Sequence, residues 1–198
     1  SSDKDNFNDY LKTIVKQIKQ IENLVNEFSD FARMPKPIFK ENDLIDIING
    51  NIKLLNEIDL SIDINFEYKK DKILFNCDNE QISRVFFNLI KNSIESIQEK
   101  HSKNADFAKK IHIVIINKND YIEFIITDNG TGFSEKNLKN ILKPYFTTKV
   151  NGSGLGLSIV NKIINDHNGT IKFEQQKNAA KIIIKLQKNV YWNTNYRW

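Results

Sequence analysis

Five of the seven glycines in this chain lie between Asp128 and Leu157. They are Gly130, Gly132, Gly152, Gly154 and Gly156. Glycine is useful where the backbone must take a positive φ or approach a ligand closely. The glycines form two clusters, one at each end of the stretch. Two such clusters on either side of a longer segment predict a nucleotide pocket with a flexible cover.

The second cluster leads into a pattern that is typical of a helix. The apolar residues after it recur at helical spacing, namely Leu157, Val160, Ile163 and Ile164. A helix beginning here would direct free N–H groups and its positive dipole end at an anion, which suits phosphate. Taken alone, each cluster also fits a bland role. Gly152 to Gly156 can serve a turn or tight packing, and Asp128-Asn129-Gly130 can be a hairpin turn.

Two asparagines upstream can bind a hard cation. The segment from Gln81 to Ile97 carries one apolar stripe, which predicts a helix, and Asn88 and Asn92 stand four residues apart on one of its faces. Carboxamide oxygens are suitable ligands for Mg²⁺, which takes few protein ligands and completes its shell with water and phosphate oxygens. A single helical asparagine is more often a solvated or capping residue. The pair, followed by both glycine clusters, favours a metal-nucleotide site.

These motifs, in this order, resemble the N, G1, F and G2 boxes of the ATP-binding domain of sensor histidine kinases, a branch of the gyrase/Hsp90/kinase/MutL superfamily. The boxes are Asn88-x-x-x-Asn92, Asp128-x-Gly130-x-Gly132, the segment around Phe146, and Gly152-x-Gly154-x-Gly156. The resemblance spans residues 41–186. It implies an α+β fold, a two-layer α/β sandwich of the Bergerat type that binds ATP and Mg²⁺.

The resemblance also implies roles for single residues. Asp128 would accept a hydrogen bond from the adenine amino group, and Gly132 would shape the adenine pocket. Asn92 would ligate Mg²⁺, Asn88 and Lys91 would lie near the phosphates, and these three would be the catalytic residues. The remaining residues expected to bind ATP are Gly130, Phe146, Thr148, Lys149, Gly152, Gly154, Leu155, Gly156 and Leu157, and the backbone N–H groups of 154–156 would meet the phosphates.

Bulk properties exclude several classes of protein. The 198 residues suit one domain with an appendage, and 29 basic against 25 acidic residues, mixed along the chain, argue against a nucleic-acid partner. Cys77 is the single cysteine, so an internal disulfide is excluded and a buried thiol is expected. No signal peptide opens the sequence and no apolar run reaches the ~18 residues of a membrane span. We expect a cytoplasmic domain, and the resemblance implies an inner-membrane sensor whose membrane segments lie N-terminal to this sequence.

The first part of the chain predicts a long helix of a dimeric bundle. Its apolar residues are spaced alternately by four and three, namely Phe7, Leu11, Ile14, Ile18, Ile21, Val25, Phe28 and Ala32. The alternative is a helix lying on its own domain, although such a helix usually has a wider apolar stripe. The helix should end at Met34-Pro35-Lys36-Pro37, because the prolines stop it. The run from Glu27 to Pro37 resembles the second dimerisation helix of nitrogen-regulation sensor kinases of the NtrY type.

The patterns divide the chain into a partial dimerisation helix (1–34), a hinge (35–40), a catalytic domain (41–186) and a tail without assigned role (187–198). In the domain we expect antiparallel strands with helices on one face. The expected helices are 44–58, the one capped by Asp78 or Asn79, 134–142 and 154–168. The expected strands are 61–68, 73–77, 111–116, 121–127, 169–174 and 180–186. The polar connection 101–110 and the candidate lid 143–153 complete the domain.

No histidine of the chain has the acidic neighbour of a phosphoacceptor, and His167 is predicted to satisfy a helix C-terminus. The resemblance therefore implies a fragment that begins after the acceptor helix. This fragment would transfer the γ-phosphoryl group of ATP to a histidine on that helix, and the histidine would then phosphorylate a response regulator receiver domain. The alternatives are an ATPase or anti-sigma serine kinase of the same fold, or a degenerate nucleotide-sensing dimerisation module. One departure from the family pattern is Ala179-Ala180, where a Gly-Thr pair is common, and this puts a threonine-held water near adenine in doubt.

Overall fold

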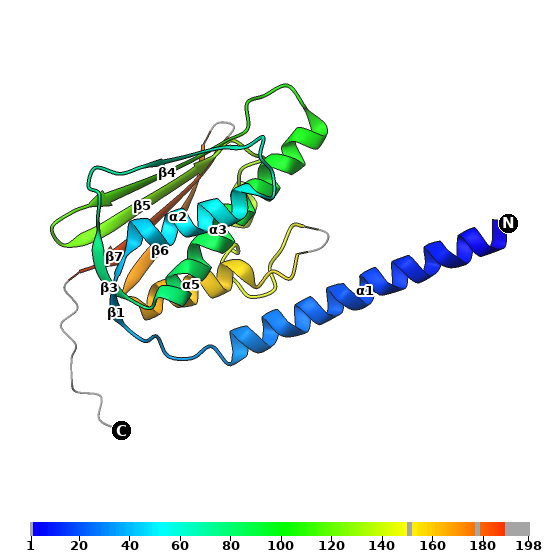
Figure 1. The fold of residues 1–198 in the computed structure, drawn as a ribbon, viewed down its shortest axis with the longest axis horizontal. Helices are drawn as coiled ribbons and strands as arrows, with labels where there is room; N and C mark the ends of the chain where they lie inside the picture. The colour runs from blue at the N-terminus through cyan, green and yellow to red at the C-terminus, as the bar shows by residue number, and fades with distance from the viewer. Residues whose placement is uncertain (1, 150–151, 177–178, 189–198) are drawn as a thin grey trace.

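A computed structural model describes residues 2–149, 152–176 and 179–188. Figure 1 shows a twisted sheet covered on one face by helices, with one long helix extending away from this body. The helices are α1 (Ser2–Ala32), α2 (Leu44–Asn56), α3 (Asn79–Lys103), α4 (Glu135–Leu138) and α5 (Gly156–Asp166). The strands are β1 (Lys40–Asp43), β2 (Asp63–Glu67), β3 (Leu74–Cys77), β4 (Lys110–Asn117), β5 (Tyr121–Asp128), β6 (Gly169–Gln176) and β7 (Ala179–Gln187). The predicted two-layer α+β architecture is confirmed.

The main sheet has the strand order β2-β4-β5-β7-β6. The pairs β4–β5, β5–β7 and β6–β7 are antiparallel as predicted. The prediction was wrong for β2, which pairs parallel with β4. The chain passes through β3 and α3 between these two strands, and a crossover of this length is what parallel pairing requires. Strand β3 lies outside the main sheet and pairs antiparallel with β1, which the sequence did not predict.

The core lies between the sheet and helices α2, α3 and α5. Alternate residues of β4, β5 and β7 are buried, as the period of two in these strands predicts. Phe86 of α3 meets Phe124 of β5 edge-on, with ring centroids 5.1 Å apart. Cys77 is buried as predicted, and burial raises the pKa of its thiol to about 11. The face of α3 opposite this core remains available for polar side chains.

Asp78 begins α3 and also holds the segment that follows α1. Its Oδ1 accepts a hydrogen bond from the backbone N–H of Gln81 at 3.0 Å, which is the predicted N-cap. Its Oδ2 accepts from the N–H of Ile38 at 2.8 Å, and the Gln81 carboxamide donates to the Pro35 carbonyl at 3.0 Å. The proline-containing segment predicted as a hinge is therefore tied to the N-terminus of α3.

Helix α1 extends into solvent along most of its length (Figure 1). The apolar side chains of the heptad pattern are exposed, between 43% for Leu11 and 62% for Phe7. Near its end, Phe31 and then Met34 pack against the core. The heptad stripe is exposed rather than packed along the domain, although Glu27 of α1 accepts a hydrogen bond from the hydroxyl of Ser153. No helix of the described residues is long and apolar enough to cross a membrane.

Several helices and strands begin or end at other residues than the sequence predicted. Helix α3 continues through Lys103 into the expected polar connection, α4 is much shorter than 134–142, and α5 begins at Gly156 rather than Gly154. Strand β7 reaches Gln187, and the N–H of Lys188 donates to the Asp120 carbonyl at 2.9 Å, so the tail begins later than predicted. The tail residues 189–198 and two residues of the candidate lid, 150–151, lie outside the described residues.

Candidate nucleotide-binding site

The predicted motifs come together along one helix, α3. Asp128 at the end of β5 contacts Ser93, Lys149 of the candidate lid contacts Asn92, and Gly156 at the start of α5 lies against Asn88. A Cβ added at Gly156 would lie 3.1 Å from the Oδ1 atom of Asn88. Residues that are far apart in the sequence thus line one side of α3.

Asp128 is a buried carboxylate that accepts hydrogen bonds from two neighbouring residues. Its side chain is 4% exposed, and its Oδ2 accepts from the hydroxyl of Ser93 at 2.9 Å. Its Oδ1 accepts from the N–H of Gly130 at 3.0 Å. Burial raises the pKa of this carboxyl, while these two donors and the charges of Lys100 and Lys149 act in the opposite direction. Each carboxylate oxygen can accept more than one bond, so Asp128 is fixed in place and still able to accept from an amino group.

The loop after Asp128 requires its glycines. A Cβ at Gly130 would lie 2.7 Å from the carbonyl carbon of Ser96, so the loop can approach α3 this closely only without a side chain. Gly132 has φ +74°, and a Cβ there would meet the carboxamide of Gln175. The same carboxamide accepts from the N–H of Phe133, and sequence reasoning missed Gln175 because β6 shows no motif.

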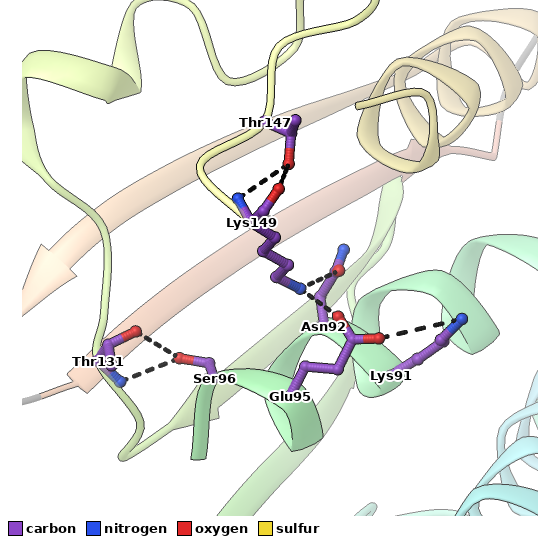
Figure 2. A network of polar contacts seen from close by, with 7 residues as sticks. All are labelled: Lys91, Asn92, Glu95, Ser96, Thr131, Thr147 and Lys149. Atoms are coloured by element: carbon purple, nitrogen blue, oxygen red, sulfur yellow. Dashed lines mark hydrogen bonds and ion pairs between the residues drawn. The ribbon is translucent and has the colours of Figure 1, made fainter. Parts of the chain in front are cut away.

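Ser96 of α3 holds the tip of this loop, as Figure 2 shows. Its hydroxyl accepts from the N–H of Thr131 at 3.0 Å and lies 3.1 Å from the Thr131 hydroxyl. Lys100, one turn further along α3, donates to the Asn129 carbonyl at 2.6 Å. These contacts were also missed, since serine and lysine on a helix carry no signal by themselves.

The second glycine cluster forms the entry to α5. Gly154 has φ +70°, and a Cβ there would lie 2.4 Å from the carbonyl carbon of Tyr145. Leu155 is fully buried, and as the N-cap residue it offers no side-chain acceptor to the first N–H groups of the helix. Gly156 begins the helix, and Leu157 packs against the core. The hydroxyl of Ser153 accepts from the N–H of Leu155 at 3.2 Å, whereas the N–H groups that follow have no side-chain cap from Leu155. The start of α5 can therefore receive an anion.

The candidate lid, between the two glycine clusters, carries Lys149, whose side chain contacts α3. The ammonium of Lys149 donates to Oδ1 of Asn92 at 2.9 Å and also contacts Oε2 of Glu95 (Figure 2). The N–H of Lys149 donates to the hydroxyl of Thr147 at 3.1 Å, and a Cβ at Gly152 would also meet that hydroxyl. Of the other predicted residues, Phe146 is half-buried and Thr148 is exposed.

The residues predicted as catalytic differ in what they contact. Asn88 donates from its Nδ2 to the Arg84 carbonyl at 2.8 Å, which leaves its oxygen toward Gly156. Lys91 is exposed and lies 3.9 Å from Oε1 of Glu95. Glu95, which contacts both lysines, was not singled out from the sequence.

The donor set fits Mg²⁺ supplied with a nucleotide. Among the described residues, no group of three or more His, Cys, Asp or Glu side chains could hold a metal ion. A metal here would therefore have few protein ligands, the Asn92 carboxamide among them, and would depend on phosphate oxygens, which is a usual arrangement for Mg²⁺. The Asn92 oxygen already faces a cation, the Lys149 ammonium, and this agrees with such a role.

The family of histidine kinase-, DNA gyrase B- and HSP90-like ATPases matches residues 77–190, and the chain belongs to this family. Its relatives include an NtrY-like sensor histidine kinase from Rickettsia felis, 35% identical over 91% of this chain and 29% of that protein. The nitrogen regulation protein NtrY of Azorhizobium caulinodans is 30% identical over 94% of this chain and 24% of that protein. The chain thus spans less than a third of the length of these relatives.

Solved structures agree with this assignment. The catalytic domain of the histidine kinase ThkA superposes with a TM-score of 0.67 at 30% identity, over 76% of this chain and 96% of that structure. ThkA in complex with the response regulator TrrA gives a TM-score of 0.73 at 26% identity, over 91% of this chain and 51% of the ThkA chain. The predicted resemblance to sensor histidine kinases is confirmed, and among the relatives are NtrY-like proteins, as the run from Glu27 to Pro37 indicated.

Proposed function

We propose that this chain binds Mg-ATP and donates the γ-phosphoryl group to a histidine on a helix outside this sequence, as the catalytic part of a sensor histidine kinase. The observation that carries the proposal is the convergence on α3 of three separate stretches. These are the end of β5 at Asp128, the lid at Lys149 and the start of α5 at Gly156. Family membership supports a nucleotide as the ligand.

In this proposal the adenine lies at Asp128, whose fixed carboxylate accepts from the exocyclic amino group. Gly130 and Gly132 let the loop beside the base lie close to α3 and Gln175, because side chains there would collide with them. The phosphates lie at the start of α5, where Gly154, Leu155 and Gly156 present backbone N–H groups. Asn92 binds Mg²⁺, which neutralises phosphate charge. Asn88 and Lys91 face the phosphates, and Phe146, Thr148, Lys149, Gly152 and Leu157 complete the site.

Catalysis by this chain consists of positioning and charge neutralisation rather than covalent chemistry. The phosphoacceptor is a histidine supplied from elsewhere. His167 is unsuited to that role, because it is 2% exposed and both ring nitrogens have backbone partners. His112 of β4 lies against Glu67, and the ring of His101 near the end of α3 lies against Phe107.

The exposed stripe of α1 supports a dimer in the full-length protein. Burying Leu11, Ile14, Ile18 and their neighbours against a second copy would remove a large apolar surface from water. We also propose a response regulator receiver domain as the partner that takes the phosphoryl group, since the related kinase ThkA has been solved with the response regulator TrrA. The parent protein is proposed to be an inner-membrane sensor in a nitrogen-regulation type of system, with this chain in the cytoplasm.

The test is phosphotransfer between separate parts. The chain is mixed with a separately prepared acceptor-helix domain of an NtrY-like kinase and γ-labelled ATP, and acid-labile label on that domain is measured. We expect Mg²⁺-dependent labelling that Asn92→Ala abolishes. The exposed carboxamide variant Asn76→Ala is the matched control and should label like the unchanged chain. Binding of Mg-ATP without any transfer would contradict the kinase proposal and favour a nucleotide-sensing module.

A further inference from the structure

Two oxygens of α3 converge on one cation. Asn92 and Glu95 are three residues apart and therefore share a face of the helix. The Lys149 ammonium lies 2.9 Å from Oδ1 of Asn92 and in direct contact with Oε2 of Glu95, as the sticks in Figure 2 show. The other Glu95 oxygen lies 3.9 Å from Lys91. A positive charge between Asn92 and Glu95 is thus favoured by both oxygens.

We infer that Asn92 and Glu95 form a single cation-binding position, called the cation point below, for which Lys149 and Mg²⁺ compete. When Mg-nucleotide binds, Mg²⁺ displaces Lys149 toward the phosphates. The inference rests on the proposed function and extends it to Glu95, which belongs to the metal site, and to Lys149, which changes partner. Two cations cannot occupy the point together, because both would need the same two oxygens and like charges a few ångströms apart repel each other.

Glu95 makes the exchange electrostatically balanced. If Lys149 simply left, Glu95 would remain a partly buried carboxylate whose one ion-pair partner among the described residues is the more distant Lys91. An incoming Mg²⁺ restores an opposite charge beside it, directly or through a bound water, since Mg²⁺ keeps several waters. The carboxylate also raises the attraction of the point for a divalent ion over that of a carboxamide alone.

Lys149 is able to make this move. Its ammonium is carried on a flexible stem, and its side chain is 37% exposed. It stands in the segment that leads to Gly152 and Gly154 and so to the start of α5. Once released from Asn92 and Glu95, the ammonium can swing to phosphates held at that helix. Lys149 would then change its partner only when metal and nucleotide are both bound.

The test is a magnesium titration of ADP binding by calorimetry with the whole chain. The quantity compared is the magnesium midpoint, the free Mg²⁺ concentration that produces half of the change in ADP affinity. Lys149→Met should lower the midpoint by about two- to fivefold, which is the effect expected for loss of one partly exposed ion pair. In the Lys149→Met background, Glu95→Gln should raise the midpoint by about two- to fivefold for the same reason. Opposite shifts cannot come from a general loss of folding.

Matched controls isolate these effects. Lys139→Met removes an exposed lysine between the two glycine clusters, and Glu99→Gln removes a carboxylate one turn further along α3 that pairs with Lys103. Both should keep the midpoint of the unchanged chain. Magnesium-dependent ADP binding with the same midpoint in Lys149→Met, or no effect of Glu95→Gln in that background, would overturn the inference alone. Absence of ADP binding by the unchanged chain would overturn the proposed function together with it.

Discussion

The backbone N–H of Asp78 donates to Nε2 of His167 at 3.1 Å, and this bond joins the residue that begins α3 to the residue that ends α5. The other ring nitrogen of His167, Nδ1, lies 2.8 Å from the Ile163 carbonyl. Because Nε2 accepts, Nδ1 must carry the proton and donate to Ile163, so the ring is neutral. Asp78 also holds Ile38, so one residue connects both helices to the segment that leads from α1.

This arrangement predicts acid sensitivity of the fold. Burial lowers the pKa of His167, whereas in the unfolded chain a histidine titrates near 6.5. Below that pH the unfolded state binds more protons than the folded state, so the free energy of unfolding falls as pH falls toward the lowered pKa. Denaturant unfolding at pH 7.5 and at pH 5.5 measures this loss.

His167→Gln should remove much of this dependence between pH 7.5 and 5.5, because glutamine does not titrate there. It should also destabilise the fold at pH 7.5 by about 1–3 kcal/mol, since a buried donor or acceptor loses its partner. His112→Gln, a histidine of β4 with a half-exposed ring, is the control. An unchanged acid dependence in His167→Gln would show that another group is responsible.

Gly154→Ala should damage the loop that we propose to bind phosphate. The left-handed backbone at φ +70° costs an L-residue roughly 1–2 kcal/mol, and the new Cβ would collide with the backbone of Tyr145. We expect ADP affinity to fall at least tenfold in calorimetry. Gly50→Ala in α2 is the matched control, because a Cβ there meets nothing within 4 Å. It should leave ADP binding unchanged and stabilise the fold by about 0.5–1 kcal/mol in thermal unfolding. Equal ADP affinity in both variants would mean that the loop at Gly154 does not bind the nucleotide.

The sequence predicted the elements that carry strong periodic patterns. The cap at Asp78, the apolar face of α3, the alternation in β4 and β5 and the helix after Gly156 all appear in the structure. Strand β1 was missed because its four residues, Lys40 to Asp43, are polar and exposed or half-buried, so no alternation marks them. The parallel pairing of β2 was missed because direction depends on how the chain returns after α3, which local pattern does not encode.

In the candidate site, too, some residues could be predicted from the sequence and others could not. The glycines and asparagines could be singled out from the sequence because few residues can take the place of Gly132 and Gly154 at a positive φ, or of a carboxamide beside a ligand. Ser93, Glu95 and Gln175 were not, because ordinary polar residues on a helix or strand acquire a role only from what the fold places opposite them. Ser93 matters through Asp128, Glu95 through Lys149 and Gln175 through Phe133. None of these pairs is close in sequence.

Asp128→Asn should weaken nucleotide binding while keeping the fold. Asparagine can still accept from Gly130, but its amide nitrogen would face the Ser93 hydroxyl and the charge-assisted acceptor is lost. We expect a loss of about 1–3 kcal/mol in the binding free energy of ADP. Asp120→Asn, in the exposed turn between β4 and β5, is the control. If calorimetry finds the two variants equal, adenine does not lie at Asp128.

Helix α1 should cause weak self-association of this chain. Its exposed stripe is larger than monomeric proteins usually leave in water, and it includes Ile14, Ile18 and Ile21 at 53%, 60% and 62% exposure. Light scattering should show an average mass that rises with concentration. Ile14→Lys with Ile18→Lys should abolish the rise, whereas Lys16→Ala, between them on the helix, should not. A constant monomer mass at high concentration would contradict the proposed dimer surface.

ATP hydrolysis by this chain should be very slow. The residue one helical turn before Asn92 is Asn88, whose carboxamide donates to the Arg84 carbonyl and keeps its oxygen toward Gly156. A carboxamide can orient a water or a ligand, but it cannot accept the proton that an attacking water must lose. A positioned general base contributes about 10²–10⁴-fold to the rate of such a step. In the proposed kinase the γ-phosphoryl group would be kept for the acceptor histidine. Steady-state phosphate release with Mg-ATP should therefore be barely above background in the unchanged chain and in Asn88→Ala. Rapid magnesium-dependent release that disappears in Asn88→Ala would identify Asn88 as part of a hydrolytic site and would favour an ATPase of the same fold over a kinase.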